Sequence, residues 1–445
     1  MKTLLTVGTL VTMDRARRVI RDGGIVVSGT TIEAVLTEAE LKGMGRFDGE
    51  VLSYPGLVAI PGFIQTHIHL CQTLFRGLAD DLPLLDWLKL KIFPFEAAHN
   101  ARSMRASAMA GIAELIRSGT TTILDMGSIH HEEEVVRAVA ETGLRAFVGK
   151  AMMDVNTICP GFKESTKDSL ETTRKQAELW HASSDGRIHY AVAPRFVLSC
   201  SDELLREAYE MTGAFPGMLF HTHAAENRSE MQAVRTRCGM DNIEFFESIG
   251  ILHSNSCLAH CIWLNDREMG LLRDRRAKVL HCPSSNLKLG SGVARVPDMI
   301  AGGVSVSLGA DGAPCNNTLD MFEEMRLAAL IQKPTFGANA MEARKVFEMA
   351  TLEGAVALGL QQEVGSIEAG KKADISLLDI DTIWNPYGRE DIYSTIVYSG
   401  SPENVTSVFV DGRCLYKNRE HSTLDSKEVV ASAREELRLL LQRVE

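Results

Sequence analysis

Eight short apolar runs, distributed over the central part of the chain, constrain its fold most strongly. Longer stretches with helical periodicity separate them, and this alternation is typical of βα repeats around a parallel sheet. Eight repeats within roughly three hundred residues have the size of a (β/α)8 TIM barrel, so the sequence predicts an α/β fold of that class. The runs are Leu57–Ile64, Thr120–Leu124, Arg145–Met152, Ile188–Ala193, Met218–Phe220, Ser256–Ala259, Lys278–Leu280 and Val304–Leu308.

Polar side chains recur at the C-terminal ends of these runs. A barrel interior alone would favour Val, Ile and Leu, whereas the active site of such a barrel is built from the strand ends and the loops that follow them. The regularity therefore predicts an active site at one end of the barrel. The residues are His67, His69, Asp125, Lys150, Arg195, His223, His260, His281 and Asp311.

The two ends of the chain have a different texture. β-branched runs bounded by glycine, such as Gly24–Gly29, are typical of antiparallel sheet, and similar runs return at 373–378 and 405–412. We expect residues 1–56 and 366–425 to form one small β domain from both termini, beside a barrel over 57–365. Residues 426–445, rich in Ala, Glu, Leu and Arg, are expected to form a C-terminal helix.

Composition limits the function classes. The net charge is −11 and basic residues are not clustered, which disfavours a nucleic-acid partner. No run of eighteen apolar residues indicates a membrane span. The nine cysteines include no C-x-x-C pair, as expected in a reducing compartment. We therefore expect a cytoplasmic enzyme that acts on a small molecule, without nucleic acid or membrane, and leave open whether it forms a homo-oligomer.

Closely spaced histidines suggest a metal site. His67 and His69 lie two residues apart, so on a strand they point to the same face, and two imidazoles on one face can chelate a metal ion. Such pairs also occur by chance. Either His221 or His223 could be a further ligand. His223 is favoured because Glu226 follows three residues later, where a carboxylate could lie beside a metal-bound water. His221 is interpreted as a hydrogen-bonded strand residue.

Asp311 and His260 are two further candidates that are informative only together with the other residues. Asp311 follows the last run, but a strand-end Asp is commonly a helix N-cap, and His260 alone is equally ambiguous. Together the set supplies three neutral imidazoles and one carboxylate, with Glu226 and His260 as proton carriers. A divalent ion in such a site lowers the pKa of bound water from about 15.7 toward 7. Asp311 could accept the proton of that water, Glu226 could protonate the leaving group, and His260 could stabilise developing charge.

At these residues the chain resembles the amidohydrolase superfamily. It is most similar to the aminohydrolase branch, which includes S-adenosylhomocysteine, methylthioadenosine and 5'-deoxyadenosine deaminases, guanine deaminases and s-triazine hydrolases. The resemblance spans nearly the whole chain in the expected order. The motifs that carry it are Pro61–His69, His223-x-x-Glu226, Leu258–Cys261, His281–Leu289, Leu308–Gly312 and Gly365–Asp374.

The resemblance implies a metal-dependent barrel over 57–365 beside a composite β-sandwich domain formed from both termini, 1–56 plus 366–425. It implies one metal ion rather than two, because no signature of a carboxylated lysine accompanies the histidine pair. Zinc is the first choice, but iron is also used in this superfamily and the ligand types do not discriminate between them. By motif match, the ligands would be His67, His69, His223 and Asp311, and the catalytic residues would be Glu226, His260 and Asp311.

The substrate is suggested by the segment Leu84–Glu96, which includes Trp87. It is similar to the region where methylthioadenosine and S-adenosylhomocysteine deaminases hold the ribose hydroxyls through a glutamate, and Glu96 falls at the matching position, 27 residues after His69. Because two carboxylate oxygens can accept from two vicinal hydroxyls, we expect Glu96 to bind ribose. The alternative is a surface glutamate at the start of a helix.

Two features depart from that picture. Lys150 and Lys163 fall near the arginines that hold the amino-acid tail in the homocysteine-type enzymes. Lysine lacks the bidentate fork of arginine, which favours a 5'-deoxy- or 5'-thio-nucleoside without a carboxylate. Gln72 and Arg195 resemble positions where guanine deaminases contact the purine edge. His281 is a further candidate substrate contact.

The sequence therefore predicts a hydrolase of C–N bonds in cyclic amidines. Its expected reaction is deamination of a 6-aminopurine nucleoside, of the 5'-deoxyadenosine, methylthioadenosine or adenosine type, with release of ammonia. The alternatives are a guanine or other oxo-heterocycle deaminase and an s-triazine amino- or chlorohydrolase. A non-enzymatic metal-binding barrel is disfavoured, because it leaves Glu226 and His260 without a role.

Overall fold

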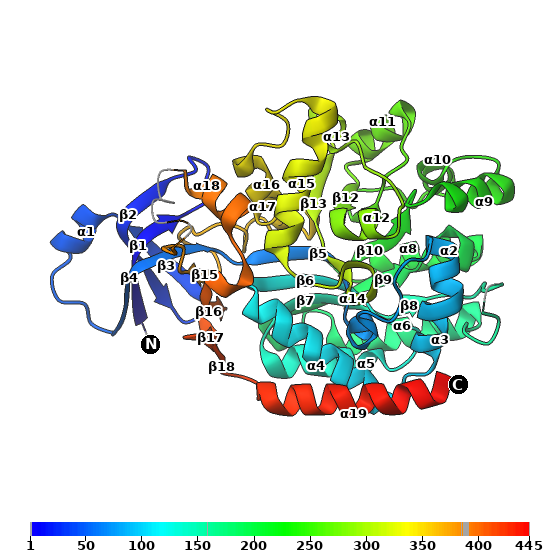
Figure 1. Cartoon of the computed structure of the whole chain (residues 1–445), viewed down its shortest axis with the longest axis horizontal. Coiled ribbons are helices and arrows are strands. Elements are labelled where there is room, and N and C mark those ends of the chain that lie inside the picture. The colour runs from blue at the N-terminus through cyan, green and yellow to red at the C-terminus, as the bar shows by residue number, and fades with distance from the viewer. Residues whose placement is uncertain (1, 158, 384, 386–390, 445) are drawn as a thin grey trace.

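The larger of two sheets in the computed structural model is parallel throughout. The structure describes residues 2–157, 159–383, 385 and 391–444. The strand order is β13-β12-β11-β10-β9-β7-β6-β5-β14, with β8 beside β9, and helices flank the curved sheet (Figure 1). The predicted α/β class is confirmed. The strands are β5 (Phe63–His69), β6 (Thr120–Met126), β7 (Arg145–Gly149), β8 (Ala151–Met152), β9 (Ile188–Pro194), β10 (Leu219–Ala224), β11 (Ser256–His260), β12 (Lys278–His281), β13 (Ser305–Leu308) and β14 (Asp311–Gly312).

Both ends of this strand order belong to one stretch of chain. β13 ends at Leu308 and β14 begins at Asp311, so only Gly309 and Ala310 separate them. β14 pairs with β5, and the Thr66 hydroxyl of β5 donates to the Leu308 carbonyl of β13 over 2.9 Å. The sheet therefore curls until its first and last strands both lie beside β5.

The first predicted run is divided between the two sheets, while the other seven fall on strands of the larger sheet. Leu57–Pro61 belongs to β4, which pairs with β15 of the second sheet, and β5 begins only at Phe63. The prediction of a single strand over Leu57–Ile64 is therefore wrong. The change of sheet occurs at Gly62, where an added Cβ would lie 2.1 Å from the Thr121 side chain, so only glycine fits this close approach.

Strands from both ends of the chain share the second sheet, in the order β18-β17-β16-β15-β4-β1-β2-β3. Blue and orange strands lie together at one end of Figure 1. Leu5, Ile25, Ala59 and Phe409 belong to an apolar cluster buried against this sheet. The strands are β1 (Lys2–Val11), β2 (Val19–Ser28), β3 (Thr31–Leu36), β4 (Glu50–Pro61), β15 (Ile375–Leu378), β16 (Val405–Val410), β17 (Arg413–Lys417) and β18 (Glu420–His421).

Helices connect the parallel strands, and the last one, α19, runs along α4 (Figure 1). No described helix is long and apolar enough to cross a membrane. A π-helix at Leu88–Ile92 lies between α2 and α3. The α-helices are α1 (Glu38–Gly43), α2 (Leu84–Trp87), α3 (Phe93–Ala97), α4 (Ala101–Arg117), α5 (Glu132–Thr142), α6 (Thr166–Trp180), α7 (Ser183–Gly186), α8 (Asp202–Thr212), α9 (Arg228–Cys238), α10 (Asn242–Ser248), α11 (Asp266–Arg275), α12 (Pro283–Lys288), α13 (Val296–Ala301), α14 (Ala313–Asn316), α15 (Met321–Phe336), α16 (Ala343–Met349), α17 (Leu352–Ala357), α18 (Ile392–Ser394) and α19 (Ser426–Val444).

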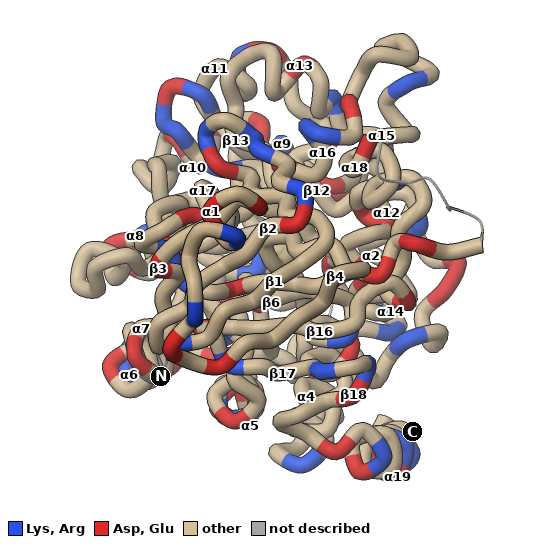
Figure 2. Tube along the Cα trace, turned by 90° about the vertical axis from the view of Figure 1, so that its left-hand side faces the viewer, with Lys and Arg blue, Asp and Glu red and all other residues tan. Residues whose placement is uncertain are grey.

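A buried ion pair joins the two sheets. Arg145, at the start of β7, donates from Nε to Asp374 over 2.9 Å and from a terminal nitrogen to Asp411 over 2.5 Å. Only 1% of Arg145 is exposed, and an unpaired charge at that depth is strongly destabilising. The terminal sheet is thus held against the parallel sheet at this point. In Figure 2, acidic and basic residues are interspersed along the visible elements.

Candidate active site

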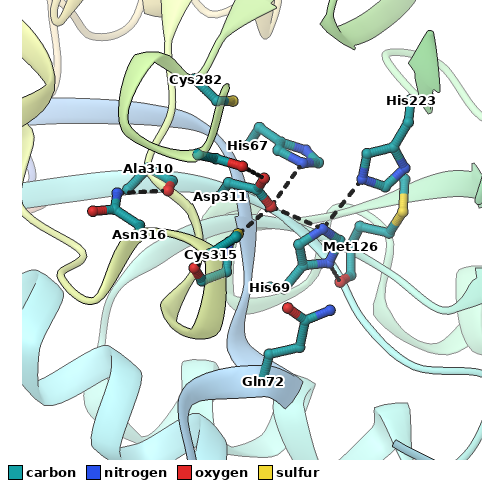
Figure 3. Close-up of polar contacts among 12 residues, drawn as sticks. His67, His69, Gln72, Met126, His223, Cys282, Ala310, Asp311, Cys315 and Asn316 are labelled. Carbon is teal, nitrogen blue, oxygen red and sulfur yellow. Dashed lines mark hydrogen bonds and ion pairs between the residues drawn. The ribbon is translucent and has the colours of Figure 1, made fainter. Parts of the chain in front are cut away.

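Four metal-binding side chains converge at the C-terminal ends of the parallel strands. They are His67 and His69 from β5, His223 from β10 and Asp311 from β14, and their ligand atoms all lie within 4.8 Å of one another. The Asp311 carboxylate lies 3.4 Å from His67 Nε2 and 3.3 Å from His69 Nε2. Figure 3 shows both contacts, with His223 Nε2 directed at His69 Nε2 over 3.3 Å. Three imidazole nitrogens and one carboxylate are a ligand set that fits a divalent ion.

Hydrogen bonds behind the rings direct their free nitrogens into this cluster. His69 Nδ1 donates to the Met126 carbonyl and His223 Nδ1 to the Arg195 carbonyl, both over 2.7 Å. Because carbonyls only accept, each Nε2 presents a lone pair, as in known metal sites. His67 Nδ1 lies 2.8 Å from His221 Nε2. His67 Nε2 is buried and has no partner among the described residues, an arrangement that a bound metal would satisfy.

The charge state of the cluster suits metal binding. Burial lowers the pKa of His67 to about 4 and that of His223 well below its usual value, so both rings are neutral near pH 7. Although burial opposes it, the neighbouring His67 and His69 rings hold the pKa of Asp311 well below its usual range. Ser285 Oγ also donates to Asp311 Oδ2 over 2.6 Å. The Asp311 carboxylate is therefore ionised near pH 7.

The backbone is strained at the strand ends that carry or adjoin the metal-binding cluster. Ala225, His260 and Asp311 have φ angles of 50°, 72° and 62°, which place three non-glycine residues in the left-handed region. Such conformations persist only where the surrounding structure holds them, and they cluster at functional sites. All three lie at the ends of β10, β11 and β13–β14, beside the metal-binding cluster.

Two proton carriers lie beside the cluster. His260 Nε2 is 3.6 Å from Glu226 Oε2 and 3.8 Å from Asp311 Oδ2, and its Nδ1 donates to Asn286 Oδ1 over 2.9 Å. Burial raises the pKa of Glu226 to about 7, which suits a group that gives and takes protons at neutral pH. Burial opposes protonation of His260, but the neighbouring Glu226 carboxyl raises the pKa of the imidazole.

A cavity opens beside these groups. His69, His223, Glu226, His260 and Asp311 line its reactive side. Its other walls are largely apolar and come from α2, the following π-helix and the loops after β9 and β12. This combination of an apolar wall and a few convergent polar groups is typical of a site for a small organic ligand. The wall residues are Leu84, Trp87, Leu88, Phe196 and Leu289, with Gln72 and Arg195 as polar members.

Three of the predicted polar substrate contacts, Glu96, Arg195 and Gln72, form one buried network. Arg195 holds both oxygens of Glu96, over 2.8 and 2.9 Å, and Gln72 Nε2 donates to Glu96 Oε1 over 2.8 Å. Arg195 and Gln72 line the cavity, whereas Glu96 is not among its lining residues. Gln72 Oε1 is buried without a partner in the described part of the chain. Ribose binding by Glu96 stays a prediction; its carboxylate already accepts from four donor atoms, two of Arg195, one of Gln72, and Ser128 Oγ over 3.4 Å.

The remaining predicted contacts lie in different places. Trp87 lines the cavity, whereas Lys150 and His281 are not lining residues. The Lys150 ammonium is buried against Glu164 and donates to the Ala151 carbonyl over 3.1 Å. His281 is 2% exposed, and neither ring nitrogen has a partner among the described residues. Contacts of Lys150 or His281 with a substrate stay predictions.

Several supporting residues were missed by reading the sequence. Ser285 and Asn286 bind Asp311 and His260. Both lie in the segment His281–Leu289, whose run of polar residues directly after a strand was an available signal. The carbonyls of Met126 and Arg195 carried no signal, because any residue type supplies a carbonyl.

Comparisons with known proteins agree with this geometry. A model of the amidohydrolase family matches residues 58–415. A 5'-deoxyadenosine deaminase from Methanothermobacter thermautotrophicus is 41% identical over 420 residues, 93% of this chain and 94% of that protein. A 5-methylthioadenosine/S-adenosylhomocysteine deaminase from Syntrophomonas wolfei is 35% identical over 99% of this chain and 100% of its own length.

A solved structure resembles the whole chain as well. An adenosine deaminase from Xanthomonas campestris with bound zinc superimposes with a TM-score of 0.92 at 29% identity, covering 99% of this chain and 98% of its own. The family match, the length over which the relatives align and the converging histidines and aspartate lead to one conclusion: this chain belongs to the amidohydrolase family.

Proposed function

We propose that this chain is a metal-dependent aminohydrolase that deaminates an adenosine-type nucleoside and releases ammonia. The observation that carries the proposal is the meeting of three histidines and one aspartate with Glu226 and His260 at one cavity. The names of the relatives favour 5'-deoxyadenosine, methylthioadenosine or S-adenosylhomocysteine as substrate. Lys150 pairs with Glu164 and does not line the cavity, so it is not placed to bind a carboxylate tail, which favours a nucleoside without one.

One divalent ion would be held by the four-residue cluster. The unpartnered His67 Nε2 and the carbonyl-anchored rings of His69 and His223 support this assignment. Zinc is the proposed ion, with iron as the alternative, since the ligand types accept both. When bound, such an ion lowers the pKa of water and so supplies a nucleophile near neutral pH.

The residues around the ion would move the protons. Asp311 would accept a proton from the attacking water while Glu226 gives its proton to ring nitrogen N1. Glu226 would then take up the remaining hydroxyl proton and deliver it to the departing amine, and the proton held by Asp311 would return Glu226 to its acid form. Asn286 orients the ring of His260. Through Nε2, His260 would hydrogen-bond to the oxygen on the reacting carbon, where negative charge develops. Water is consumed, and an inosine-type product and ammonia leave. The apolar wall with Trp87 would cover the purine ring.

Ammonia release by the metal-replete protein tests this function. 5'-Deoxyadenosine, methylthioadenosine and adenosine would be offered separately, and the ultraviolet spectrum would report conversion of the 6-amino purine to the 6-oxo product. We expect turnover of at least one of the three. No ammonia and no inosine-type product from any of them would refute the proposal.

A second candidate is deamination of guanine or another oxo-heterocycle. It is favoured by the cavity itself, because Arg195 and Gln72 line it and Gln72 Oε1 lacks a partner, whereas Glu96 lies behind them. An arginine donor and an amide acceptor match the C=O and N–H of an oxo-purine edge. Glu96→Ala separates the candidates: a large rise in KM for nucleosides supports ribose binding, and an unchanged KM favours a free base.

The finer architecture belongs to the same proposal. The parallel sheet would close as a (β/α)8 barrel within residues 57–365, without Leu57–Pro61, which belong to β4 of the second sheet, because β13 and β14 both adjoin β5. The terminal strands would form a β-sandwich domain, 1–56 plus 366–425, around their own apolar cluster, and 426–445 would be a separate C-terminal helix. A cytoplasmic location and a small-molecule substrate complete the proposal, and a homo-oligomer remains open to measurement.

A further inference from the structure

We propose that Glu324, a buried residue of α15, is a positioning residue that fixes the metal ligand Asp311 from outside the site. This inference rests on the proposed metal site but not on the identity of the substrate. Glu324 is fully buried, at 0% exposure, and among the described residues no Lys or Arg forms an ion pair with it. A buried carboxyl without a cation is costly, so its contacts call for an explanation.

One set of contacts runs through α12. The Ser284 backbone N–H donates to Glu324 Oε2 over 3.2 Å, and the Ser284 hydroxyl donates to Oε1. The next residue, Ser285, donates from its hydroxyl to Asp311 Oδ2 over 2.6 Å. Glu324 therefore holds the first turn of α12 in the position from which Ser285 reaches the metal ligand.

A second set of contacts runs through the loop after Asp311. Asn316 Nδ2 donates to Glu324 Oε1 over 2.8 Å and to the Ala310 carbonyl over 2.7 Å, and Figure 3 shows the latter contact beside Asp311. The Ala310 N–H donates to Gln65 Oε1 over 3.1 Å. Both polar groups of Ala310 are thus held by side chains.

These contacts matter because the backbone at Asp311 is in a strained conformation. Asp311 has a φ of 62°, a conformation that a non-glycine residue leaves unless its neighbours hold it. Glu324 reaches Asp311 twice, through the backbone by way of Asn316 and through the carboxylate by way of Ser284–Ser285. Relaxation of either path would turn the carboxylate away from the three histidines.

A carboxyl group suits this task better than an amide. Three donors, two from Ser284 and one from Asn316, point at its two oxygens. Glutamine has the same shape but only one acceptor oxygen, and its NH2 group would face a donor. Glu324→Gln should therefore break at least one path with little change in volume.

The test measures metal binding rather than turnover. Full-length wild type, Glu324→Gln and Asn316→Ala would be compared for Zn2+ affinity by competition with a chromophoric chelator, and for the visible d–d spectrum after loading with Co2+. We expect a 10- to 100-fold weaker affinity, the range found when residues that support metal ligands are changed, and an altered Co2+ spectrum. The control is Glu342→Gln, whose exposed carboxylate precedes α16 and makes no capping hydrogen bond, and it should behave as wild type.

The outcomes separate the hypotheses. A folded Glu324→Gln or Asn316→Ala protein with wild-type Zn2+ affinity and Co2+ spectrum would overturn the inference. A double variant should lose less than the sum of the single losses, because Asn316 lies on one of the two paths that Glu324 holds; full additivity would also count against the inference. Wild type that binds Co2+ with imidazole ligands but releases no ammonia would overturn the proposed reaction alone, whereas wild type that binds no ion would overturn both.

Discussion

Replacing Glu96 should reveal what the Glu96–Arg195 pair does. Both side chains are buried, with exposures of 0% and 3%, and two hydrogen bonds of 2.8 and 2.9 Å join them. Glu96→Ala leaves the Arg195 guanidinium buried and unpaired. Removing one partner of such a pair costs about 3–5 kcal/mol, so the free energy of unfolding should fall by that amount.

The matched comparison removes both charges. In Glu96→Ala/Arg195→Met no buried charge is left alone, so much of the lost stability should return. The Arg195 carbonyl that accepts from His223 Nδ1 is a backbone group and survives the substitution. Urea denaturation of the wild type, both single variants and the double variant gives the interaction energy. Losses that are small and additive would refute the claim that the two residues form one buried unit.

The same variants bear on recognition. If ribose hydroxyls bind Glu96, they must replace Arg195 or Gln72 as donors to a carboxylate that is already engaged. In that case the KM for nucleosides should rise steeply in Glu96→Ala, while kcat stays nearly constant. If the guanidinium of Arg195 reads the substrate, Arg195→Met raises KM more than Glu96→Ala does.

Three further predictions concern protons and attachment. Burial raises the pKa of Glu226 to about 7, so the protonated acid is lost as pH rises through that value, and kcat/KM should decline on the alkaline side. Glu226→Gln should lower kcat by about 10²- to 10⁴-fold and remove this pH dependence. An alkaline decline that persists in the variant would assign the dependence to another group. Asn286→Ala removes the partner of His260 Nδ1 and should lower kcat by about tenfold with KM unchanged. This is the effect expected from the loss of one hydrogen bond of about 1 kcal/mol. A change in KM alone would contradict the orienting role of Asn286. Arg145→Met leaves Asp374 and Asp411 unpaired and should lower the free energy of unfolding by about 3–5 kcal/mol without moving KM, which urea denaturation and steady-state kinetics would check.

Local patterns in the sequence were enough for the parallel strands. Runs such as Ser256–Ala259 and Lys278–Leu280 are apolar after their first residue because helices and the interior cover both faces of such strands, and they reappear as β11 and β12. The histidine pair was equally readable, since residues two apart on a strand share a face. His67 and His69 do converge with His223 and Asp311.

The structural features that the sequence did not predict depend on contacts between distant segments. Leu57–Pro61 is apolar in either sheet, so its pattern does not reveal that it pairs with β15. Glu96 and Arg195, 99 residues apart, were predicted as separate substrate contacts, yet each satisfies the other. Lys150 was placed by its position after a strand, but the ion pair with Glu164 depends on a loop whose path the sequence does not specify.

The metal content of the purified protein tests the central claim most directly. Wild type and Asp311→Ala would be prepared in parallel, and the metal-to-protein ratio would be measured by mass spectrometry together with ammonia release. The account predicts about one zinc or iron ion per wild-type chain, as a four-ligand site requires, with loss of both the ion and the activity in the variant. An unchanged ratio in a folded Asp311→Ala protein, or activity that persists after the ion is removed, would contradict it.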